Sequence, residues 1–259
     1  MKPKITVVTV CYNAEKQLED TIKSVLEQTY TNKEYILIDG NSNDGTLEII
    51  AKYANYLAYY VSEPDRGIYD AMNKAVSHAT GEWILFMNAG DSFYDSDVLQ
   101  KIFTHEIDRK YAVLYGDTVV CFQCGKAILK SKCLTAMKRH MPFCHQSCLV
   151  RTEKLKDTPF DLKYKVVADY NFFHHLYEQG AEFLYMQTVV SNYESGGFST
   201  QNSALSMIET AAINGSDKSR WFPLCRQYTI LYYKLLRMLG PIADFFRKVK
   251  YNHYSKKIS

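Results

Sequence analysis

Short apolar runs alternate with amphipathic segments along the first ninety residues of the chain. The apolar runs are rich in β-branched and aromatic side chains, which is typical of buried strands: residues 5–10, 35–38, 57–61 and 82–87. The segments between them place apolar residues at helical spacing, as Leu18, Ile22 and Val25 show. This order predicts an α/β fold with a Rossmann-like, mostly parallel central sheet and helices on both faces.

The pattern changes after about residue 110. Two apolar runs separated by Gln123-Cys124-Gly125 predict an antiparallel hairpin. After it we expect a helix at residues 166–179 and a strand at residues 182–186. A Gly-containing loop at residues 191–200 and two further helical segments, at residues 204–213 and 222–250, are expected to follow. The sequence contains no internal repeat and no low-complexity segment.

Charge is unevenly distributed along the chain. The whole sequence carries a formal charge of +3, but residues 218–259 contain ten Lys and Arg and a single acid, Asp244. Basic and apolar residues are interleaved there, which predicts interfacial helices, interrupted near Gly240-Pro241, that contact an anionic membrane surface through residues 222–257. The alternative is a helix packed on the body with a solvated basic face. The acidic body argues against nucleic-acid binding.

The N-terminal residues and the cysteines indicate a cytoplasmic protein. The chain has no run of about 18 apolar residues, and its first apolar run is too short for a signal sequence. Seven cysteines are an odd number, so we expect reduced thiols. Cys121, Cys124, Cys133 and His140 suggest a zinc site as an alternative, but their spacing is irregular and small buried side chains explain them better.

Two acidic turns each follow directly after a predicted strand. The first is Asp39-Gly40-Asn41-Ser42-Asn43-Asp44-Gly45 and the second is Asn88-Ala89-Gly90-Asp91. Ligands of open α/β sheets bind beyond the carboxyl ends of the strands, where carboxylates suit a ribose, a base edge or a divalent metal. The structural alternative for the second turn is a cap for a helix that begins near Ser96.

With these turns, several motifs along residues 4–200 together resemble the family-2 inverting glycosyltransferases of the GT-A fold, which build bacterial surface polysaccharides. The motifs, in order, are Thr9-Val10-Cys11-Tyr12-Asn13, the segment from Ile38 to Thr46, the segment from Ser62 to Asn73, Asn88-Ala89-Gly90-Asp91, His145-Gln146 and Ala168-Asp169-Tyr170. Each motif is weakly specific alone, and their order and spacing carry the resemblance.

The resemblance implies a function and a division of the chain. We expect transfer of a sugar, with inversion, from a UDP- or GDP-sugar to a polysaccharide or lipid-linked oligosaccharide, by an enzyme at the inner face of the membrane. Residues 1–110 are then the donor-binding half, residues 111–215 the acceptor-binding half and residues 216–259 a basic helical tail. Two alternatives are a sugar nucleotidyltransferase, for which no Gly-rich triphosphate loop is present, and a non-catalytic relative in an assembly complex.

The resemblance also implies a metal site and a catalytic base. Mg²⁺ or Mn²⁺ on the diphosphate needs one or two carboxylates, and Asp91 is the expected ligand, with Asn88 in place of the family's usual first acid. His145 is expected near the diphosphate or acceptor, also as a metal ligand, against the alternative of a core histidine. Asp169 is expected to take the acceptor's proton, against the alternative of a helix cap.

The remaining expected contacts are to the donor nucleotide. Asp39 can accept the imide N–H of uracil or the N–H groups of guanine, and Tyr12 can stack on the base. The structural alternatives are a helix cap for Asp44, an exposed turn residue for Arg66 and a hydrogen-bonded pair for Asp70 and Asn73. The complete set of expected donor-binding residues is Thr9, Tyr12, Asn13, Asp39, Asp44, Asp65, Arg66, Asp70, Asn73, Asn88, Ala89 and Gly90.

Overall fold

The computed structural model describes residues 2–122, 125–197 and 202–239, and its centre is one mixed sheet. The strand order is β3-β2-β1-β4-β8-β6-β9-β5, and β7 pairs with β6 beside this path. The strands are β1 (Ile5–Cys11), β2 (Lys33–Asp39), β3 (Tyr59–Ser62), β4 (Trp83–Phe86), β5 (Ser92–Phe93), β6 (Tyr111–Phe122), β7 (Gly125–Leu129), β8 (Cys148–Arg151) and β9 (Glu182–Glu194). The α/β class is therefore confirmed.

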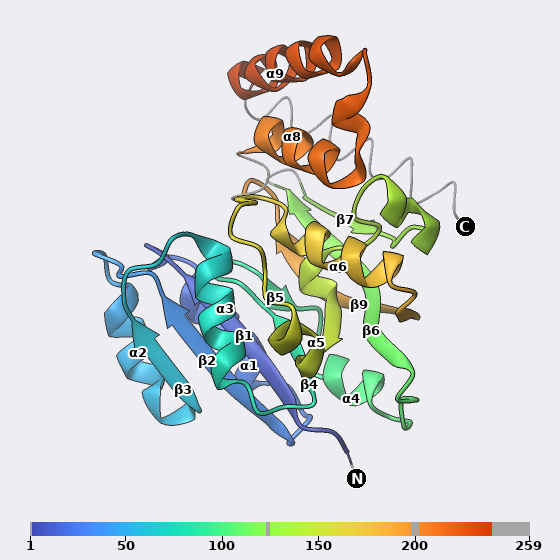
Figure 1. Ribbon diagram of the computed structural model, residues 1–259. Coiled ribbons are helices and arrows are strands. Elements are labelled where there is room, and N and C mark those ends of the chain that lie inside the picture. The colour runs from blue at the N-terminus through green and yellow to red at the C-terminus, as the bar shows by residue number, and fades with distance from the viewer. Residues whose placement is uncertain (1, 123–124, 198–201, 240–259) are drawn as a thin grey trace.

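The N-terminal half is the parallel part of the sheet (Figure 1). Strand β1 pairs in parallel with β2 on one side and β4 on the other, and β2 pairs in parallel with β3. The connections are α1 (Leu18–Leu26), α2 (Thr46–Tyr53) and α3 (Ile68–His78), as the alternating pattern predicts. All four carboxyl ends consequently lie along one edge of the sheet, where the acidic turns begin.

The C-terminal half extends the sheet with antiparallel pairs and with one long parallel pair, that of β6 with β9. Strand β8 pairs antiparallel with both β4 and β6 and so joins the two halves. The prediction did not include β8, and it was wrong to begin a loop at residue 191, because β9 continues to Glu194 against β6. Helix α6 (Ala168–Glu178) begins two residues later than predicted. Helix α5 (Thr152–Asp157) was also not predicted, whereas α4 (Val98–Ile102) lies where a helix beginning near Ser96 was considered.

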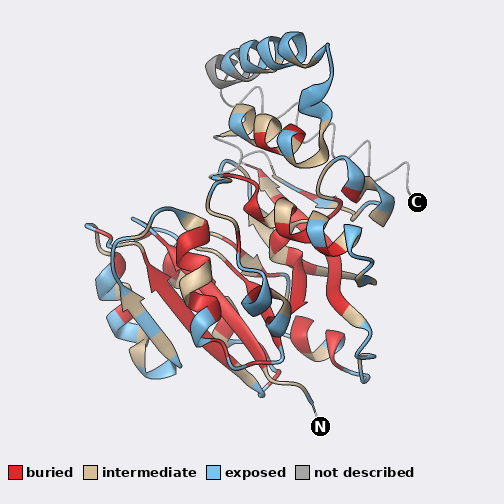
Figure 2. Ribbon diagram, in the orientation of Figure 1, coloured by how far each residue is buried: buried red, intermediate tan, exposed pale blue. Residues whose placement is uncertain are grey.

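Two apolar cores cover the two faces of the sheet. One packs side chains of α3, α5 and α6 against strand residues such as Val8, Ile36 and Phe86. The other packs α1, α2 and α4 against the alternate strand residues, such as Val7 and Leu37. Successive residues of a strand point to opposite faces, so strands buried on both sides read as continuous apolar runs. Figure 2 shows the resulting band of buried residues through the centre.

Helices α8 (Ser203–Asn214) and α9 (Phe222–Leu239) lie together outside the sheet, at the top of Figure 1. Helix α8 contacts α6, whereas α9 is exposed along its described side chains (Figure 2). Within the described ranges no helix is both long and apolar enough to span a bilayer. Three predicted segments lie outside the described residues: the helix beyond residue 239, most of the hairpin turn, and the end of the loop at residues 198–200.

Candidate active site

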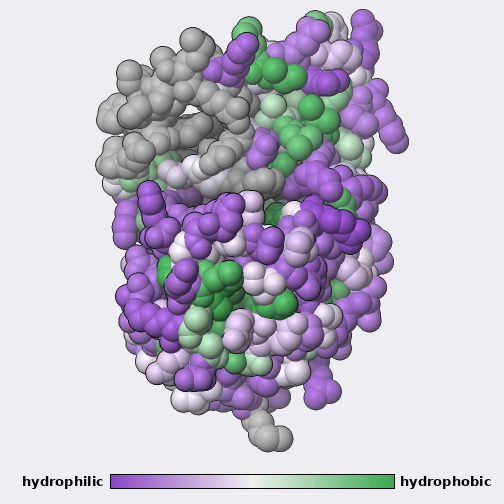
Figure 3. Space-filling model, turned by 90° about the vertical axis from the view of Figure 1, so that its left-hand side faces the viewer, coloured by the Kyte–Doolittle hydropathy of each residue, from purple (hydrophilic) through white to green (hydrophobic). Residues whose placement is uncertain are grey.

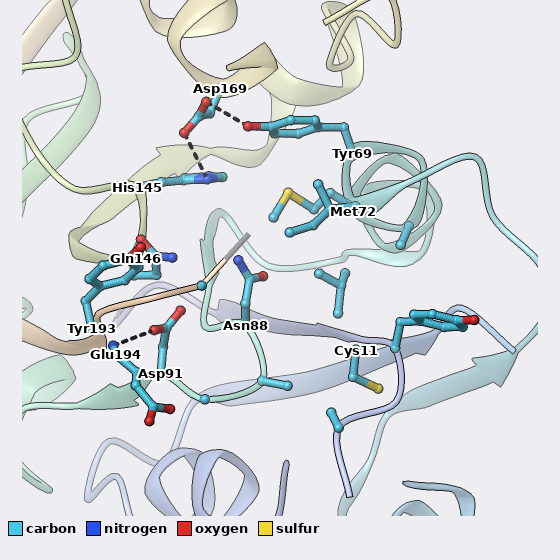
Figure 4. A pocket seen from close by; sticks show the side chains of 18 of the residues that line it. Cys11, Tyr69, Met72, Asn88, Asp91, His145, Gln146, Asp169, Tyr193 and Glu194 are labelled. Atoms are coloured by element: carbon cyan, nitrogen blue, oxygen red, sulfur yellow. Dashed lines mark hydrogen bonds and ion pairs between the residues drawn. The ribbon is translucent and has the colours of Figure 1, made fainter. Parts of the chain in front are cut away.

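A cavity of about 810 Å³ opens at the carboxyl ends of the parallel strands (Figure 4). Its walls come from the ends of β1, β4 and β9, from the first turns of α3 and α6, and from the segment around His145. A smaller hollow of about 320 Å³ adjoins it between Tyr12 and Asp65, with Gly40, Asn41 and Pro64 completing its lining. The position matches the edge at which the sequence predicts ligand binding.

The expected site residues divide between the cavity lining and its supports. Eight of them line the cavity: Tyr12, Asp65, Asn88, Ala89, Gly90, Asp91, His145 and Asp169. The other seven make contacts that hold the surrounding backbone: Thr9, Asn13, Asp39, Asp44, Arg66, Asp70 and Asn73. The motif residues are thus brought to one place, with different tasks.

Asp39 is a support of the turn after β2. Its carboxylate is fully buried and accepts hydrogen bonds from the Ser42 amide (2.9 Å), from the Ser42 hydroxyl (2.5 Å) and from the Ser62 hydroxyl (2.6 Å). Cys11 adds a thiol contact at 3.5 Å, and burial beside Asp39 raises the pKa of this thiol. Both carboxylate oxygens of Asp39 therefore already accept hydrogen bonds from the protein. This geometry favours a structural role for Asp39 over direct pairing with a base.

The backbone conformation of the adjoining turns depends on asparagines. Asn13 and Asn41 both have positive φ, 49° and 66°, which asparagine tolerates better than most residues. The Asn13 side chain accepts a hydrogen bond from the Asn43 amide at 3.0 Å, and the Asn13 amide donates to the Ser42 hydroxyl at 2.8 Å. The loops after β1 and β2 are thereby tied together beside Tyr12, which is 63% exposed.

Asp44 and Thr9 also make hydrogen bonds that stabilise the backbone around the cavity. Asp44 accepts hydrogen bonds from the Thr46 amide and hydroxyl at the start of α2, and from the Glu15 amide. Thr9 is buried, and its hydroxyl bonds the Met87 carbonyl at 2.7 Å and the Tyr35 hydroxyl at 2.8 Å. Both residues therefore fix the strands and turns that carry the lining.

Helix α3 is anchored by polar residues of its own motif. Arg66 donates to Asp70 at 2.9 Å across one turn, and its side chain is 74% exposed. Asn73 bonds the amide and the carbonyl of Phe160, both at 2.9 Å, and so ties α3 to the segment before α6. Asp65 accepts a hydrogen bond from the Gly67 amide at 2.8 Å. Of these side chains, that of Asp65 belongs to a residue that lines the described cavity, whereas Arg66, Asp70 and Asn73 lie outside its lining.

The turn after β4 presents two oxygen donors to the cavity. The Asn88 side-chain oxygen is buried without a hydrogen-bond partner among the described residues, and Asn88 points into the cavity (Figure 4). Asp91 is buried, and this burial, together with the charge of Glu194, raises its pKa to about 7. Hydrogen bonds from the Glu194 amide and from Gln146 lower the pKa but do not outweigh the burial. A buried carboxylate and an orphaned amide oxygen are the kinds of group that a hard cation would satisfy.

Asp169 lies across the cavity in the first turn of α6. Its side chain is 19% exposed and faces Tyr69 and His145 (Figure 4). The Tyr69 hydroxyl donates to its Oδ1 at 2.8 Å, and His145 Nδ1 is 3.6 Å from its Oδ2. His145 is packed among the rings of Phe86, Phe160 and Phe173, and this burial lowers its pKa despite the nearby Asp169 charge.

The sequence model of glycosyl transferase family 2 matches residues 6–194, which include the described strands of the sheet except for Ile5, the first residue of β1, and the cavity lining up to Glu194. The chain belongs to glycosyl transferase family 2. The predicted family is therefore confirmed. Helices α8 and α9 lie beyond the matched residues.

Two glycosyltransferases are similar to this chain in sequence. A PGL/p-HBAD biosynthesis glycosyltransferase of Mycobacterium bovis (strain BCG / Pasteur 1173P2) is 32% identical over 207 residues, which cover 76% of this chain and 79% of that one. The putative glycosyltransferase EpsE of Bacillus subtilis (strain 168) is 31% identical over 158 residues, 58% of this chain and 56% of that one.

Solved structures confirm the predicted GT-A fold. Residues 1–349 of S. aureus TarS in complex with UDP superpose with a TM-score of 0.63 at 18% identity, covering 95% of this chain and 81% of that one. The mannosyltransferase PcManGT of Pyrobaculum calidifontis, in complex with GDP-Man and Mn²⁺, gives 0.60 at 16% identity, covering 96% and 88%.

Sequence reasoning assigned no role to several residues of this family-2 site. Tyr69, Gln146 and Glu194 all line the cavity, and the first two contact Asp169 and Asp91, respectively. Gln146 and Tyr69 lie inside the recognised motifs, but a tyrosine in an amphipathic helix reads as packing. Glu194 lies in the segment that was predicted as a loop, so its place beside Asp91 depends on the pairing of β9 with β6.

Proposed function

We propose that the chain transfers a sugar from a UDP- or GDP-sugar to a hydroxyl of a polysaccharide or lipid-linked oligosaccharide, with inversion at the anomeric carbon. The observation that carries the proposal is the cavity itself. It places Asp169 on one wall, opposite the acidic turn with Asn88 and Asp91 on another, at the sheet edge where nucleotides bind. A nucleotide-sugar between these walls would have its diphosphate leaving group near Asp91 and its anomeric carbon accessible from the side of Asp169.

The nucleotide would occupy the end of the cavity next to the smaller hollow. Tyr12 is exposed there and offers a ring face to the base, while Asp65 offers a carboxylate to the N–H groups of a base or to the hydroxyls of a ribose. Asp39 would act indirectly by holding Ser42 and the turn over which the nucleotide lies. The UDP and GDP-Man complexes of the fold neighbours TarS and PcManGT support either nucleotide.

Mg²⁺ or Mn²⁺ would be held by Asp91 and the Asn88 side-chain oxygen. These residues fit such an ion for two reasons. The Asn88 oxygen is buried without a hydrogen-bond partner among the described residues, and Asp91, in the same turn, is also buried. The chemistry that a bound divalent cation supplies is neutralisation of the diphosphate charge. Mg²⁺ normally takes only one or two carboxylates from a protein, with phosphate oxygens and water completing its coordination.

Asp169 would act as the general base. It accepts the proton of the acceptor hydroxyl while the acceptor oxygen forms a bond to the anomeric carbon and the bond from that carbon to the diphosphate oxygen breaks. The nucleoside diphosphate leaves with the electron pair of that bond, and the configuration inverts. His145 is better placed beside Asp169 than as a metal ligand, because its Nδ1 faces the Asp169 carboxylate and aromatic rings surround it.

Thermal unfolding with UDP, GDP, CDP and ADP, each with and without Mn²⁺, tests the donor site. A nucleotide present at about 100 times its Kd stabilises the folded state by about 2.7 kcal/mol, which corresponds to a rise in Tm of roughly 5 °C for a chain of this size. We expect this rise for UDP or GDP with Mn²⁺. No rise with any of them would contradict the proposal and favour a non-catalytic relative.

Asp169→Asn tests the base. The variant should bind the same nucleotide and lose about 10²- to 10⁴-fold in turnover, since it retains the shape of the side chain without its basicity. Asp157→Asn, at an exposed aspartate at the end of α5, is the matched control and should keep wild-type activity. Full activity of Asp169→Asn would exclude Asp169 as the base.

A further inference from the structure

The two oxygens of the Asp169 carboxylate have different surroundings. Oδ1 accepts the Tyr69 hydroxyl at 2.8 Å and the amide of Tyr170 at 2.8 Å. Oδ2 faces His145 Nδ1 at 3.6 Å, which is longer than a hydrogen bond. Oδ1 is thus held by two donors, whereas Oδ2 makes no hydrogen bond with the described residues that would compete with an acceptor in the cavity that Asp169 lines.

The Tyr69 side chain is itself held firmly. It lies in the first turn of α3, is 7% exposed, and its ring packs on Phe160 with ring centroids 5.4 Å apart. Its hydroxyl also lies 2.8 Å from the carbonyl oxygen of Val166, three residues before Asp169. The hydroxyl has a single proton, and the charged Asp169 carboxylate attracts it more strongly than the neutral carbonyl does, so the donation to Oδ1 prevails.

We propose that Tyr69 is a positioning residue for the transfer reaction: by occupying Oδ1 of Asp169, it makes Oδ2 the oxygen that receives the acceptor's proton. This inference rests on the proposed role of Asp169. The lone pairs of Oδ1 are engaged by Tyr69 and the Tyr170 amide, so a proton on Oδ1 would displace a hydrogen bond, whereas a proton on Oδ2 leaves both in place.

The same contacts fix the direction in which Oδ2 points. Tyr69 approaches Asp169 from α3 and the Tyr170 amide belongs to the helix of Asp169 itself, so these two donors fix Oδ1, while His145, in the segment before β8, faces Oδ2. Removing the Tyr69 hydroxyl removes the restraint from α3 and frees the carboxylate to rotate. Misplacement of a reacting group by about 1 Å costs on the order of 10²-fold in rate.

Tyr69→Phe tests the proposal because it keeps the ring and removes the hydroxyl. With the UDP- or GDP-sugar that wild type turns over, we expect kcat for nucleoside diphosphate release to fall roughly 10- to 100-fold while KM for the donor stays within about twofold. Tyr185→Phe is the matched control, because Tyr185 also donates its hydroxyl to a carboxylate, that of Asp117, at 2.8 Å. It should leave kcat unchanged. An unchanged kcat in Tyr69→Phe, or an equal loss in both variants, would overturn the proposal.

Two further measurements separate this inference from the proposed function. If Asp169→Asn keeps wild-type turnover, the assignment of the base fails and the role of Tyr69 fails with it. If Asp169→Asn is inactive and Tyr69→Phe is fully active, only the role of Tyr69 fails. A double-mutant cycle in thermal unfolding needs no substrate: Tyr69→Phe and Asp169→Ala should together lower Tm by less than the two separate losses combined. Additive losses would show that the hydroxyl and the carboxylate are not coupled.

Discussion

Glu34 is a buried carboxylate at the start of β2, at the end of the sheet opposite to the cavity. Burial alone would raise its pKa, but hydrogen bonds from Lys4, Thr6 and Thr80 outweigh this effect and lower the pKa to about 2. The contacts include the Lys4 ammonium at 2.6 Å and the Thr80 amide at 2.6 Å. Glu34 therefore joins the starts of β1 and β2 to the turn that leads into β4.

Glu34→Gln should lower the free energy of unfolding by about 2–3 kcal/mol at pH 7. Because the folded state holds the pKa below its usual range, the stabilisation is complete above about pH 4.5 and disappears as the pH falls toward 2. Urea unfolding across this range should show the two proteins converging. Glu48→Gln, at an exposed position of α2, should change stability by less than about 0.5 kcal/mol throughout. A pH-independent difference would contradict the assignment.

Asn88 carries the second prediction at this scale. Asn88→Ala removes a buried oxygen that lacks a partner among the described residues, so the ligand-free protein should be no less stable than wild type. The Mn²⁺-dependent affinity for UDP or GDP should fall about tenfold, whereas Asn88→Asp should restore or increase it. Isothermal titration with and without Mn²⁺ measures both, and Asn43→Ala, in the exposed turn after β2, is the control. A metal-independent loss would instead make Asn88 a nucleotide contact.

The sequence predicted which turns form the site better than it predicted what each residue does there. Asp39 and Asp65 each follow a predicted strand, but Asp39 is enclosed by Ser42 and Ser62 while Asp65 lines the cavity. The difference depends on hydroxyl groups contributed by neighbouring loops, which periodicity does not reveal. Tyr69 was missed for a related reason, since its partner is 100 positions away in the chain.

Among the helices, α8 has a direct connection to the segment that precedes Asp169. Its Glu209 is 8% exposed and accepts hydrogen bonds from the amides of Lys165 (2.8 Å), Val166 (2.9 Å) and Val167 (3.2 Å). The Val166 carbonyl oxygen of this segment lies 2.8 Å from the Tyr69 hydroxyl oxygen. A helix outside the residues matched by the family model thus holds the backbone next to the proposed base.

Glu209→Gln should release this segment. An amide side chain has one acceptor oxygen and turns a donor toward the backbone N–H groups, so we expect a loss of about 1–3 kcal/mol in unfolding free energy. Hydrogen exchange should accelerate at the amides of residues 165–167, and turnover should fall. Glu178→Gln, at an exposed position of α6, should do neither. Unchanged exchange at these three amides would show that Glu209 does not hold them.

Elements were predicted well where local pattern and tertiary pairing agree. The strands and helices up to residue 87 alternate with clear apolar periodicity, and the structure contains all of them. Strand β8 is only four residues long and is stabilised by β4 and β6 on either side, so its own sequence gives little signal. The end of β9 is polar, at Asn192 and Glu194, and is a strand because β6 pairs with it.

The molecule as a whole places its proposed chemistry and its exposed apolar surface on different elements. The sheet and the helices on its two faces bury their apolar residues, whereas α9 leaves Leu224, Tyr228 and Leu231 at least 60% exposed. These residues recur at helical spacing along one stripe, and Figure 3 shows apolar side chains at the upper end of the molecule as well as in a patch on the middle of its body. Such a stripe beside a region of net positive charge fits an anionic membrane surface, where a lipid-linked acceptor would be found.

Leu224→Ser together with Leu231→Ser should therefore weaken binding to vesicles that contain phosphatidylglycerol, by about tenfold or more for each leucine that enters the interface. Binding of the wild type should also fall with rising salt, because the basic residues of 218–259 contribute to it. Vesicle co-sedimentation measures both effects, and Leu47→Ser, at an exposed leucine of α2, is the matched control. Donor turnover without vesicles should be unchanged in both the double variant and the Leu47→Ser control. If the double variant binds vesicles as wild type does, α9 is not the membrane contact; loss of binding with intact turnover would assign α9 to the approach of the acceptor rather than to the chemistry.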